Sequence, residues 1–335
     1  MDEATSQAVP ELGAVLAEAR ARLGEGARIV SRLRDGLYEV HLSLGEPDHG
    51  RVPQWGVAAH DPRHVLDQVP LAAARLLTDR ELLAVRRPLE GPLHGPALLT
   101  PAAAGVLVHE CFGHTSEADN YLTRPRSAGR LGDRLTPAPL TVRDRPGLLR
   151  FAGSYRRDDE GTRARTVTLL DRGRWAGLLT GRSTAWLSGG ASTGHARGPS
   201  GATAPRCSVL EAVPGPYAPA GLRRWMGDGW LWGTPIGGFS VEGRLIVELL
   251  WVRRVRSGAV TGEVRGPVVV CAGKRALAAG LVAVGNDPTV HSSPYRCVKA
   301  GHEVGSTLIT PSMLLRRAVL RPLADLAEVV GRSGL

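Results

Sequence analysis

Two histidines and two glutamates lie close together in the segment HECFGHTSE, which runs from His109 to Glu117. Neutral imidazole is the commonest nitrogen ligand for zinc, and a carboxylate beside the metal can take a proton from a bound water molecule. The residue types therefore suit a metal site with its own base, Glu110. The alternative is that His109 and His114 are core histidines and that Glu110 is a surface charge.

The spacing of the two histidines differs from the familiar HExxH pattern. In a regular α-helix, residues i and i+4 lie about 40° apart around the axis, whereas residues i and i+5 lie about 140° apart. A regular helix would therefore point His109 and His114 in divergent directions. We expect a π-type bulge or a break near Gly113 to bring the two side chains together.

The residues before the motif favour a buried helix. Thr100 can cap a helix, and Pro101 suits the first helical position. The run from Ala102 to Val108 is almost wholly apolar. The sequence thus predicts that the motif sits on a distorted, buried helix.

The run HECFGHTSEAD resembles the HExxGHxxExD signature of the TldD/PmbA family of metallopeptidases. The resemblance extends over roughly residues 90 to 315. Other segments that resemble the family's motifs are DDEGT at 158–162, TGHAR at 193–197, PR at 205–206, GND at 285–287 and CVKAGH at 297–302.

This resemblance implies that His109, His114 and Cys297 bind Zn²⁺ and that Glu110 is the general base of amide-bond hydrolysis. Two imidazoles, one thiolate and an open water position also make sense as a catalytic zinc site. Within the family, TldD-type subunits carry the motif and PmbA-type subunits lack it. The resemblance therefore implies an active, motif-bearing subunit that forms a dimer, either with itself or with a related motif-lacking chain.

Five further residues are candidates for supporting roles. Glu117 could orient a ligand imidazole, and His302 could donate to an oxyanion or support a ligand. Family members are thought to bind an extended peptide at a sheet edge, and His195, Arg197 and Arg206 are candidates for contacts with it. Each of these three could equally be an ordinary solvated loop residue.

The expected fold class is α+β, with a small mixed α/β amino-terminal domain at 1–95 and a β-rich metallopeptidase domain at 96–335. The amino-terminal part is shorter than is usual in the family, which leaves substrate access and pairing open. Expected elements are helices at 11–23, 61–84 (interrupted at Pro70) and 312–330, a strand at 38–44, a hairpin pairing 167–170 with 175–180, and strands at 239–256 and 261–272.

The composition does not favour a nucleic-acid binder despite a net charge of +10. Lys274 and Lys299 are the only lysines among 42 basic residues, which suggests a GC-rich genome rather than selection for phosphate contacts. No recognition motif accompanies the charge. The excess could instead favour an acidic substrate or partner.

The absence of a long apolar run and of a signal sequence predicts a cytoplasmic protein outside the membrane. Four cysteines without a disulfide pattern agree with a reducing compartment, and Cys111 is expected to be a buried small hydrophobe.

The substrate stays open at this point. The resemblance implies unfolded peptides or the precursors of peptide natural products. One alternative is an amide in a small-molecule biosynthetic intermediate, and another is a non-catalytic subunit that supports a partner. Such a subunit would have no need of Glu110. The segment 218–238, which carries Trp225, Trp230 and Trp232, could line a substrate channel of its own.

Overall fold

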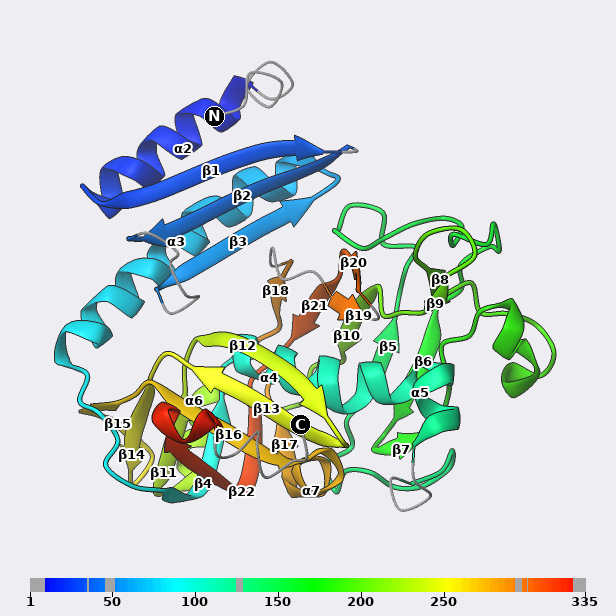
Figure 1. Ribbon diagram of the computed structural model, residues 1–335. Helices are drawn as coiled ribbons and strands as arrows, with labels where there is room; N and C mark the ends of the chain where they lie inside the picture. The colour runs from blue at the N-terminus through cyan, green and yellow to red at the C-terminus, as the bar shows by residue number, and fades with distance from the viewer. Residues whose placement is uncertain are drawn as a thin grey trace.

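The computed structural model of the protein describes residues 10–34, 36–45, 52–124, 129–292, 297–299 and 301–327. These residues form a small helix-and-sheet layer at the amino-terminal end and two larger β-sheets from the rest of the sequence (Figure 1). The expectation of an α+β fold, mixed at the front and β-rich behind, is confirmed.

A three-stranded antiparallel sheet and two helices form the amino-terminal layer, with the strand order β1–β2–β3. The helices pack against each other and against the sheet, and side chains such as Leu23, Leu42 and Leu76 fill the core between them. The helices and the strand expected in this region are all present. The bounds are α2 (Pro10–Leu23), β1 (Ala27–Arg34), β2 (Leu37–Leu44), β3 (Gln54–Ala59) and α3 (Pro62–Val85).

The helix α3 continues through Pro70, so the expected interruption at this residue is wrong. Proline inside a helix removes one backbone hydrogen bond and crowds the preceding turn. In α3 this loss is offset by the burial of a long apolar face that includes Val65, Val69 and Leu76. Asp61 also caps the helix by accepting a hydrogen bond from the Arg63 amide at 3.0 Å.

The larger sheet contains nine strands within the described residues. Its order is β12–β13–β16–β22–β4–β11–β14–β15, and β17 pairs with β22. The strand β12 therefore lies at one end of the sheet. The bounds are β4 (Leu93–Leu99), β11 (Gly229–Trp232), β12 (Pro235–Val241), β13 (Arg244–Leu249), β14 (Val252–Arg256), β15 (Ala259–Arg265), β16 (Val268–Gly273), β17 (Leu281–Val284) and β22 (Met313–Pro322).

The helix expected over 312–330 is wrong for most of this segment, because residues 313–322 form β22 and a short 3₁₀ turn (Leu323–Asp325) follows. Residues 328–330 lie outside the described residues. Leu314, Leu315 and Leu320 are all buried, and β22 is an interior strand that pairs with β4, β16 and β17. A strand covered on both faces reads as an apolar run, which periodicity cannot distinguish from a buried helix.

A second sheet has the order β18–β21–β10–β5–β6–β7. The expected turn at 171–173 joins β6 to β7, although β7 is shorter than expected. Two small hairpins, β8–β9 and β19–β20, stand apart from both sheets. The bounds are β5 (Val142–Asp144), β6 (Val167–Asp171), β7 (Arg174–Trp175), β8 (Ala196–Arg197), β9 (Ala204–Pro205), β10 (Val209–Ala212), β18 (Thr289–His291), β19 (Cys297–Lys299), β20 (His302–Val304) and β21 (Thr307–Thr310).

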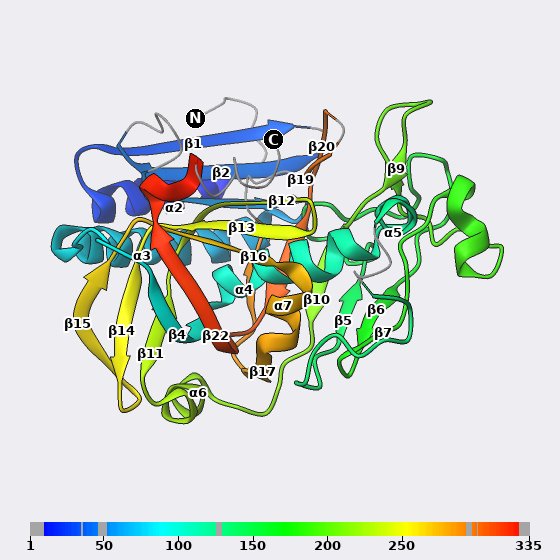
Figure 2. The same ribbon diagram turned by 60° about the horizontal axis from the view of Figure 1, so that its bottom comes forward.

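The helix α4 (Pro101–Val108) lies between the two sheets, in contact with β12 and β13 of the larger one and β18 and β21 of the smaller one (Figures 1 and 2). Thr100 caps it by accepting from the Ala103 amide, and Pro101 occupies the first turn, as expected. The other helices are short: α5 (Ala118–Thr123), α6 (Pro219–Met226), α7 (Lys274–Gly280) and a 3₁₀ helix (Arg182–Ser188).

The buried carboxylate of Asp79 joins the amino-terminal layer to the larger sheet. It accepts hydrogen bonds from Trp55 Nε1 at 3.0 Å within the layer and from Thr234 Oγ1 and Trp251 Nε1, both at 2.7 Å, across the boundary. Burial raises the pKa of Asp79, and the three donors counteract only part of that shift. These bonds hold the layer against the sheet.

Among the described residues, no helix has both the length and the apolar character needed to cross a membrane.

Candidate metal centre

The motif lies where the regular helix α4 gives way to a π-helical turn (His109–Gly113), followed by a 3₁₀ turn (His114–Ser116). The His114 amide donates to the His109 carbonyl, which is the i→i+5 bond of a π-helix. This turn returns to the same face after five residues, so the two imidazole rings lie 4.5 Å apart between centroids. The predicted local distortion is confirmed.

Gly113 has a different role from the one that the sequence suggested. Its φ of −62° and ψ of −72° are in the ordinary helical region, so the bend does not depend on a left-handed conformation. A Cβ at this position would lie only 2.8 Å from both Cys207 Sγ and Leu210 Cδ1. The glycine therefore lets the π-turn pack closely against Leu210 of β10 and against Cys207, two residues before that strand.

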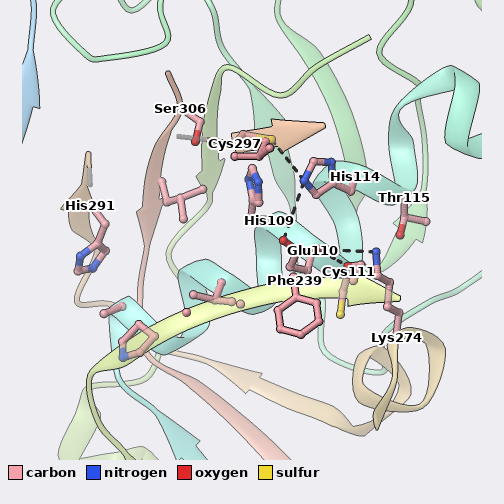
Figure 3. Close-up of a pocket in the computed structure, with 18 of the residues that line it drawn as sticks. His109, Glu110, Cys111, His114, Thr115, Phe239, Lys274, His291, Cys297 and Ser306 are labelled. Atoms are coloured by element: carbon pink, nitrogen blue, oxygen red, sulfur yellow. Dashed lines mark hydrogen bonds and ion pairs between the residues drawn. The ribbon is translucent and has the colours of Figure 1, made fainter. Parts of the chain in front are cut away.

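The hairpin β19–β20 brings Cys297 to the two histidines, as Figure 3 shows. One ligand atom from each of His109, His114 and Cys297 lies within 4.8 Å of the others, and Cys297 Sγ is 3.4 Å from His114 Nε2. Burial would raise the pKa of the Cys297 thiol, but the neighbouring imidazoles of His109 and His114 outweigh it and lower the pKa to about 5. Cys297 is thus a thiolate at neutral pH.

These three residues have the chemistry of a zinc site. Two imidazole nitrogens and one thiolate are a donor set that catalytic zinc ions use, with a fourth position left for water. His109 Nδ1 is buried and has no hydrogen-bond partner among the described residues. This nitrogen is therefore free to bind a metal ion. The residues present therefore fit the metal that the resemblance implies.

A second group of potential ligands, His114, Glu117 and Cys207, also lies within 4.8 Å. It shares His114 with the first group. Burial, and then the nearby Glu117 carboxylate, raise the pKa of the Cys207 thiol well above its ordinary value. Cys207 is therefore protonated at neutral pH, whereas Cys297 offers an anionic sulfur, and the first group suits a metal better.

The Glu110 carboxylate lies beside the candidate ligands. Its Oε1 is 3.9 Å from His114 Nε2, while Oε2 accepts a hydrogen bond from Ser240 Oγ and lies 4.0 Å from Lys274 Nζ. Burial would raise its pKa, but the imidazoles of His114 and His109, the Ser240 hydroxyl and the Lys274 ammonium together lower it. An ionised carboxylate in this position can accept a proton from a water molecule next to the ligands.

Glu117 is fully buried behind His114. Its Oε2 accepts from His114 Nδ1 at 2.9 Å, Lys299 Nζ at 2.8 Å and Asn120 Nδ2 at 3.0 Å, while Oε1 accepts from the Cys207 amide at 3.2 Å. Burial works against the charge, yet His114 and Lys299 lower the pKa of Glu117 to about 2. The bond to Nδ1 leaves His114 Nε2 directed at Cys297.

Arg206 lies behind Cys297 rather than against a ligand cavity. It is 1% exposed, and its Nη2 donates to the Cys297 sulfur at 3.1 Å and to the Cys297 carbonyl. Its Nη1 donates to the carbonyl of His302 at 3.3 Å. The structure thus brings His302 close to the site through its backbone, and the His302 side chain does not line the cavity described below.

His195 and Arg197, the other candidates for peptide contacts, have their side chains engaged by other protein groups. His195 is fully buried, with Nε2 3.4 Å from Asp144 Oδ1. Arg197 stacks on the ring of Tyr155 at 4.4 Å and pairs with Asp159 at 3.4 Å. Neither side chain lines the cavity beside the metal-binding motif.

The candidate ligands open onto a cavity of about 1100 Å³. One wall consists of the motif and β12, and the other includes residues of β3 and α3 from the amino-terminal layer. Cys111 reaches this cavity but is 3% exposed, and burial raises its pKa to about 12, in keeping with a buried small hydrophobe. The segment 218–238, expected to line a substrate channel, does so in part: residues 234–238 line this cavity, whereas Trp225, Trp230 and Trp232 do not.

The residues that hold the two glutamates were not predicted, although the sequence carries a signal for two of them. The two lysines of the chain both lie at the site: Lys274 approaches Glu110, and Lys299 binds Glu117 and Asp119, each at 2.8 Å. Lysine is a compact point charge, whereas arginine presents a wide planar fork. In so arginine-rich a chain, the two lysines mark positions where a compact cation is needed.

Comparisons with known proteins agree with the motif. The PmbA/TldA metallopeptidase C-terminal domain matches residues 93–320. The chain is 37% identical to a metalloprotease of Synechocystis sp. over 134 residues, which is 39% of this chain and 28% of that protein. It is 33% identical to a zinc metalloprotease TldD homologue of Saccharolobus solfataricus over 107 residues, which is 30% of this chain and 23% of that protein. The matches thus span less than a third of these relatives.

Solved structures share the fold at low sequence identity. TldE from Thermococcus kodakarensis superposes with a TM-score of 0.66 at 18% identity, over 85% of this chain and 62% of that one. A putative modulator of DNA gyrase from Bacteroides thetaiotaomicron gives a TM-score of 0.66 at 17% identity, over 96% of this chain and 74% of that one. Because the family domain matches well over half of the sequence, the chain belongs to the PmbA/TldD metallopeptidase family.

Proposed function

We propose that this protein is a zinc-dependent peptidase that hydrolyses amide bonds. The observation that carries the proposal is the convergence of His109, His114 and Cys297 within 4.8 Å, with the Glu110 carboxylate beside them on the wall of a large cavity. His109, His114 and Cys297 would hold the zinc ion, and Glu110 would be the catalytic base.

When bound, zinc would polarise the scissile carbonyl and make a water molecule more acidic. Glu110 takes a proton from the attacking water and passes it to the leaving amine, so no covalent intermediate with the protein is needed. Ser240 and Lys274 hold one carboxylate oxygen of Glu110, which fixes the position of the base. Glu117 fixes the orientation of the His114 ring, and Arg206 keeps the Cys297 thiolate in place.

The strand β12 supports an extended peptide as the substrate. It is at the end of its sheet, and residues 235–240 all line the cavity. Such an edge can pair with an extended chain through backbone hydrogen bonds, which bind with little sequence preference. We therefore favour unfolded peptides or peptide natural-product precursors over a small-molecule amide intermediate.

The close approach of β12 to the motif depends on Gly238. A Cβ there would lie 2.4 Å from Val106 Cγ1 on α4, whereas a Cβ on Gly237 would meet nothing within 4 Å. Gly238 thus lets the edge strand lie directly over the helix that carries the motif. A peptide paired with β12 would pass beside Glu110, which Ser240 of the same strand contacts.

We further propose that the protein acts in the cytoplasm as a dimer, either with itself or with a related motif-lacking chain. The likeness of its fold to TldE supports a related partner, and the absence of a disulfide among its four cysteines agrees with a reducing compartment. A purely supporting, non-catalytic role is less consistent with the held Glu110 carboxylate.

Zinc content and peptide cleavage test the function together. Wild type, Glu110→Gln and the exposed control Glu90→Gln are purified with and without a co-expressed related chain, and zinc is measured by mass spectrometry. We expect near-stoichiometric zinc in all three, and cleavage of a mixed peptide library by wild type and Glu90→Gln only. Absence of zinc, or equal cleavage by Glu110→Gln, would overturn the proposal. Zinc without cleavage of any peptide would exclude peptides and leave the small-molecule amide to be tested.

A further inference from the structure

The wall of the cavity opposite the motif contains an arginine that forms no ion pair with a carboxylate of the described residues. This wall is formed by Trp55 of β3, Gln68 and Arg75 of α3, and His291 of β18. Figure 3 places His291 at the opposite side of the pocket from His114 and Lys274. A ligand that reaches from the motif to this wall would place its far end next to Arg75.

Arg75 is held by stacking on Trp55. Its guanidinium carbon lies 4.9 Å from the centre of the Trp55 ring, and Trp55 Nε1 donates in turn to Asp79 at 3.0 Å. Stacking occupies the face of a guanidinium but leaves its N–H groups, which lie in the plane, free to bind a carboxylate. Among the described residues, Arg75 donates no side-chain hydrogen bond and has no carboxylate within 4 Å. The buried Asp79 acts on its charge from beyond that distance, but both oxygens of Asp79 already accept hydrogen bonds from other side chains.

Three of the other four cations around the cavity lie within 4.0 Å of a carboxylate. No Asp or Glu of β3 or α3 lines the cavity. Arg75 is therefore the cation of this opposite wall that makes no ion pair among the described residues. Arg124 makes none either, but it lies at the end of α5 beside the motif and its Nε donates to the Tyr121 carbonyl at 3.2 Å. The remaining four cationic side chains have these neighbours: Lys299 binds Glu117 and Asp119, Lys274 lies 4.0 Å from Glu110, Arg275 lies 3.9 Å from Asp133, and Arg124 stacks on Tyr121 and Trp175.

His291 adds a neutral polar group next to Arg75. Burial, and then the nearby Arg75 charge, lower the pKa of His291 to about 3, so its imidazole is uncharged at neutral pH. Its ring lies 6.0 Å from that of Trp55, and its Nε2 is buried without a partner among the described residues. The wall thus combines one fixed positive charge with uncharged polar groups, which is suited to a single anionic group.

We propose that Arg75, stacked on Trp55 and flanked by His291, binds a carboxylate of the substrate at a distance from the bond that is cut. The substrates would then be acidic peptides or acidic acyl amides rather than neutral ones. The carboxylate site is inferred from the geometry of this wall alone. The role of that site in selecting substrates rests on the proposed peptidase function. The carboxylate could belong to an acidic side chain or to the carboxyl terminus of a peptide.

The proposed carboxylate site is tested by measuring peptide binding to the zinc-loaded Glu110→Gln protein, so that no turnover is needed. The probes are acetylated, amidated heptapeptides of alanine and glycine that carry one Glu at each position in turn, and the same set with Gln. A Gln peptide with a free carboxyl terminus forms a second arm, which separates a terminal carboxylate from an acidic side chain. Affinities are measured by isothermal titration calorimetry.

We expect at least one acidic peptide to bind roughly 10- to 100-fold more tightly than its neutral counterpart, as for a hydrogen-bonded ion pair. Adding Arg75→Gln should abolish this preference, and Arg75→Lys should restore part of it. Arg63→Gln, on the same helix but outside the cavity, should leave the preference intact. Equal affinity for acidic and neutral peptides, or a preference that survives Arg75→Gln, would overturn the inference.

Different results would refute the proposed peptidase function and the proposed carboxylate site. If wild type cleaves peptides but shows no acidic preference, the carboxylate site is wrong and the proposed function stands. If the preference depends on Arg75 but wild type cleaves no peptide, the carboxylate site stands and the peptidase assignment is wrong. Thermal unfolding of each Arg75 variant shows whether a loss of binding reflects a loss of the fold.

Discussion

Replacing Glu117 with glutamine should weaken the metal site without touching a candidate ligand. The carboxylate is fully buried and accepts five hydrogen bonds, of which those from His114 and Lys299 involve charged or chargeable groups. Glutamine keeps one acceptor oxygen, but its NH₂ group would face groups that donate hydrogen bonds to the Glu117 carboxylate and cannot accept one. Breaking a buried ion pair costs about 3–5 kcal/mol, and we expect about 3 kcal/mol here because Lys299 keeps its other contacts.

The effect on the metal should be larger than the effect on the rest of the molecule. Loss of a carboxylate that orients a ligand imidazole typically lowers metal affinity by about 10- to 100-fold. Zinc affinity is measured by competition with a chromophoric chelator, and the free energy of unfolding by urea denaturation of the metal-free protein. Asp119→Asn is the matched control: it removes the other carboxylate of Lys299, which is partly exposed, and should change zinc affinity by less than about threefold.

The pH dependence of stability follows from the same carboxylate. The pKa of Glu117 falls from the ordinary 4.5 to about 2 in the folded protein, so its stabilising contribution is complete above about 4.5 and is lost as pH falls towards 2. The Gln variant should therefore lose less stability over this range than wild type. If Glu117→Gln binds zinc as tightly as wild type and shows the same acid profile, the reasoning about this carboxylate is refuted.

Three further outcomes are expected. In the metal-free protein, Cys297 should react with iodoacetamide at pH 7 while Cys111 stays unmodified, because their pKa values are about 5 and about 12. Zinc should protect Cys297 from this reaction. Peptide mapping by mass spectrometry identifies the labelled cysteine, and faster labelling of Cys111 would contradict this order of pKa values. Gly238→Ala should lower the free energy of unfolding by about 1–3 kcal/mol through its clash with α4, whereas Gly237→Ala, with open space around it, should change it little; equal effects in urea denaturation would refute the packing argument. Asp79→Ala, which leaves three donors without an acceptor, should cost at least about 3 kcal/mol by the same measurement, and a near-neutral result would show that the layer is held to the sheet by other contacts.

The local chemistry of the motif could be predicted from the sequence because it depends on neighbouring residues. The spacing of His109 and His114 excluded a regular helix, and the cap at Thr100 located the start of α4. The identification of Cys297 needed the family resemblance, since no spacing rule links it to a histidine 183 residues away. Ser240, which is 130 residues from Glu110, carried no such signal.

The remaining errors have a common physical origin in tertiary packing. The apolar run in β22 is compatible with a buried helix or an interior strand, and its pairing with β4 and β16 decides between them. Burial of one face of α3 outweighs the cost of Pro70. Arg75 and Trp55 become part of the cavity because long-range contacts, including those of Asp79 and of Arg86 with the Leu250 carbonyl, hold their layer against the larger sheet. No local pattern in the sequence reveals these contacts.

The small hairpin that carries Cys297 has consequences for how a metal would leave the protein. An isolated two-stranded hairpin is only marginally stable in water, and β19–β20 pairs with neither large sheet in the described residues. Two sets of contacts anchor the hairpin: Arg206 donates to Cys297, and Lys299 binds Glu117 and Asp119. We therefore expect zinc to exchange through local opening of this hairpin, at a rate far above that of global unfolding.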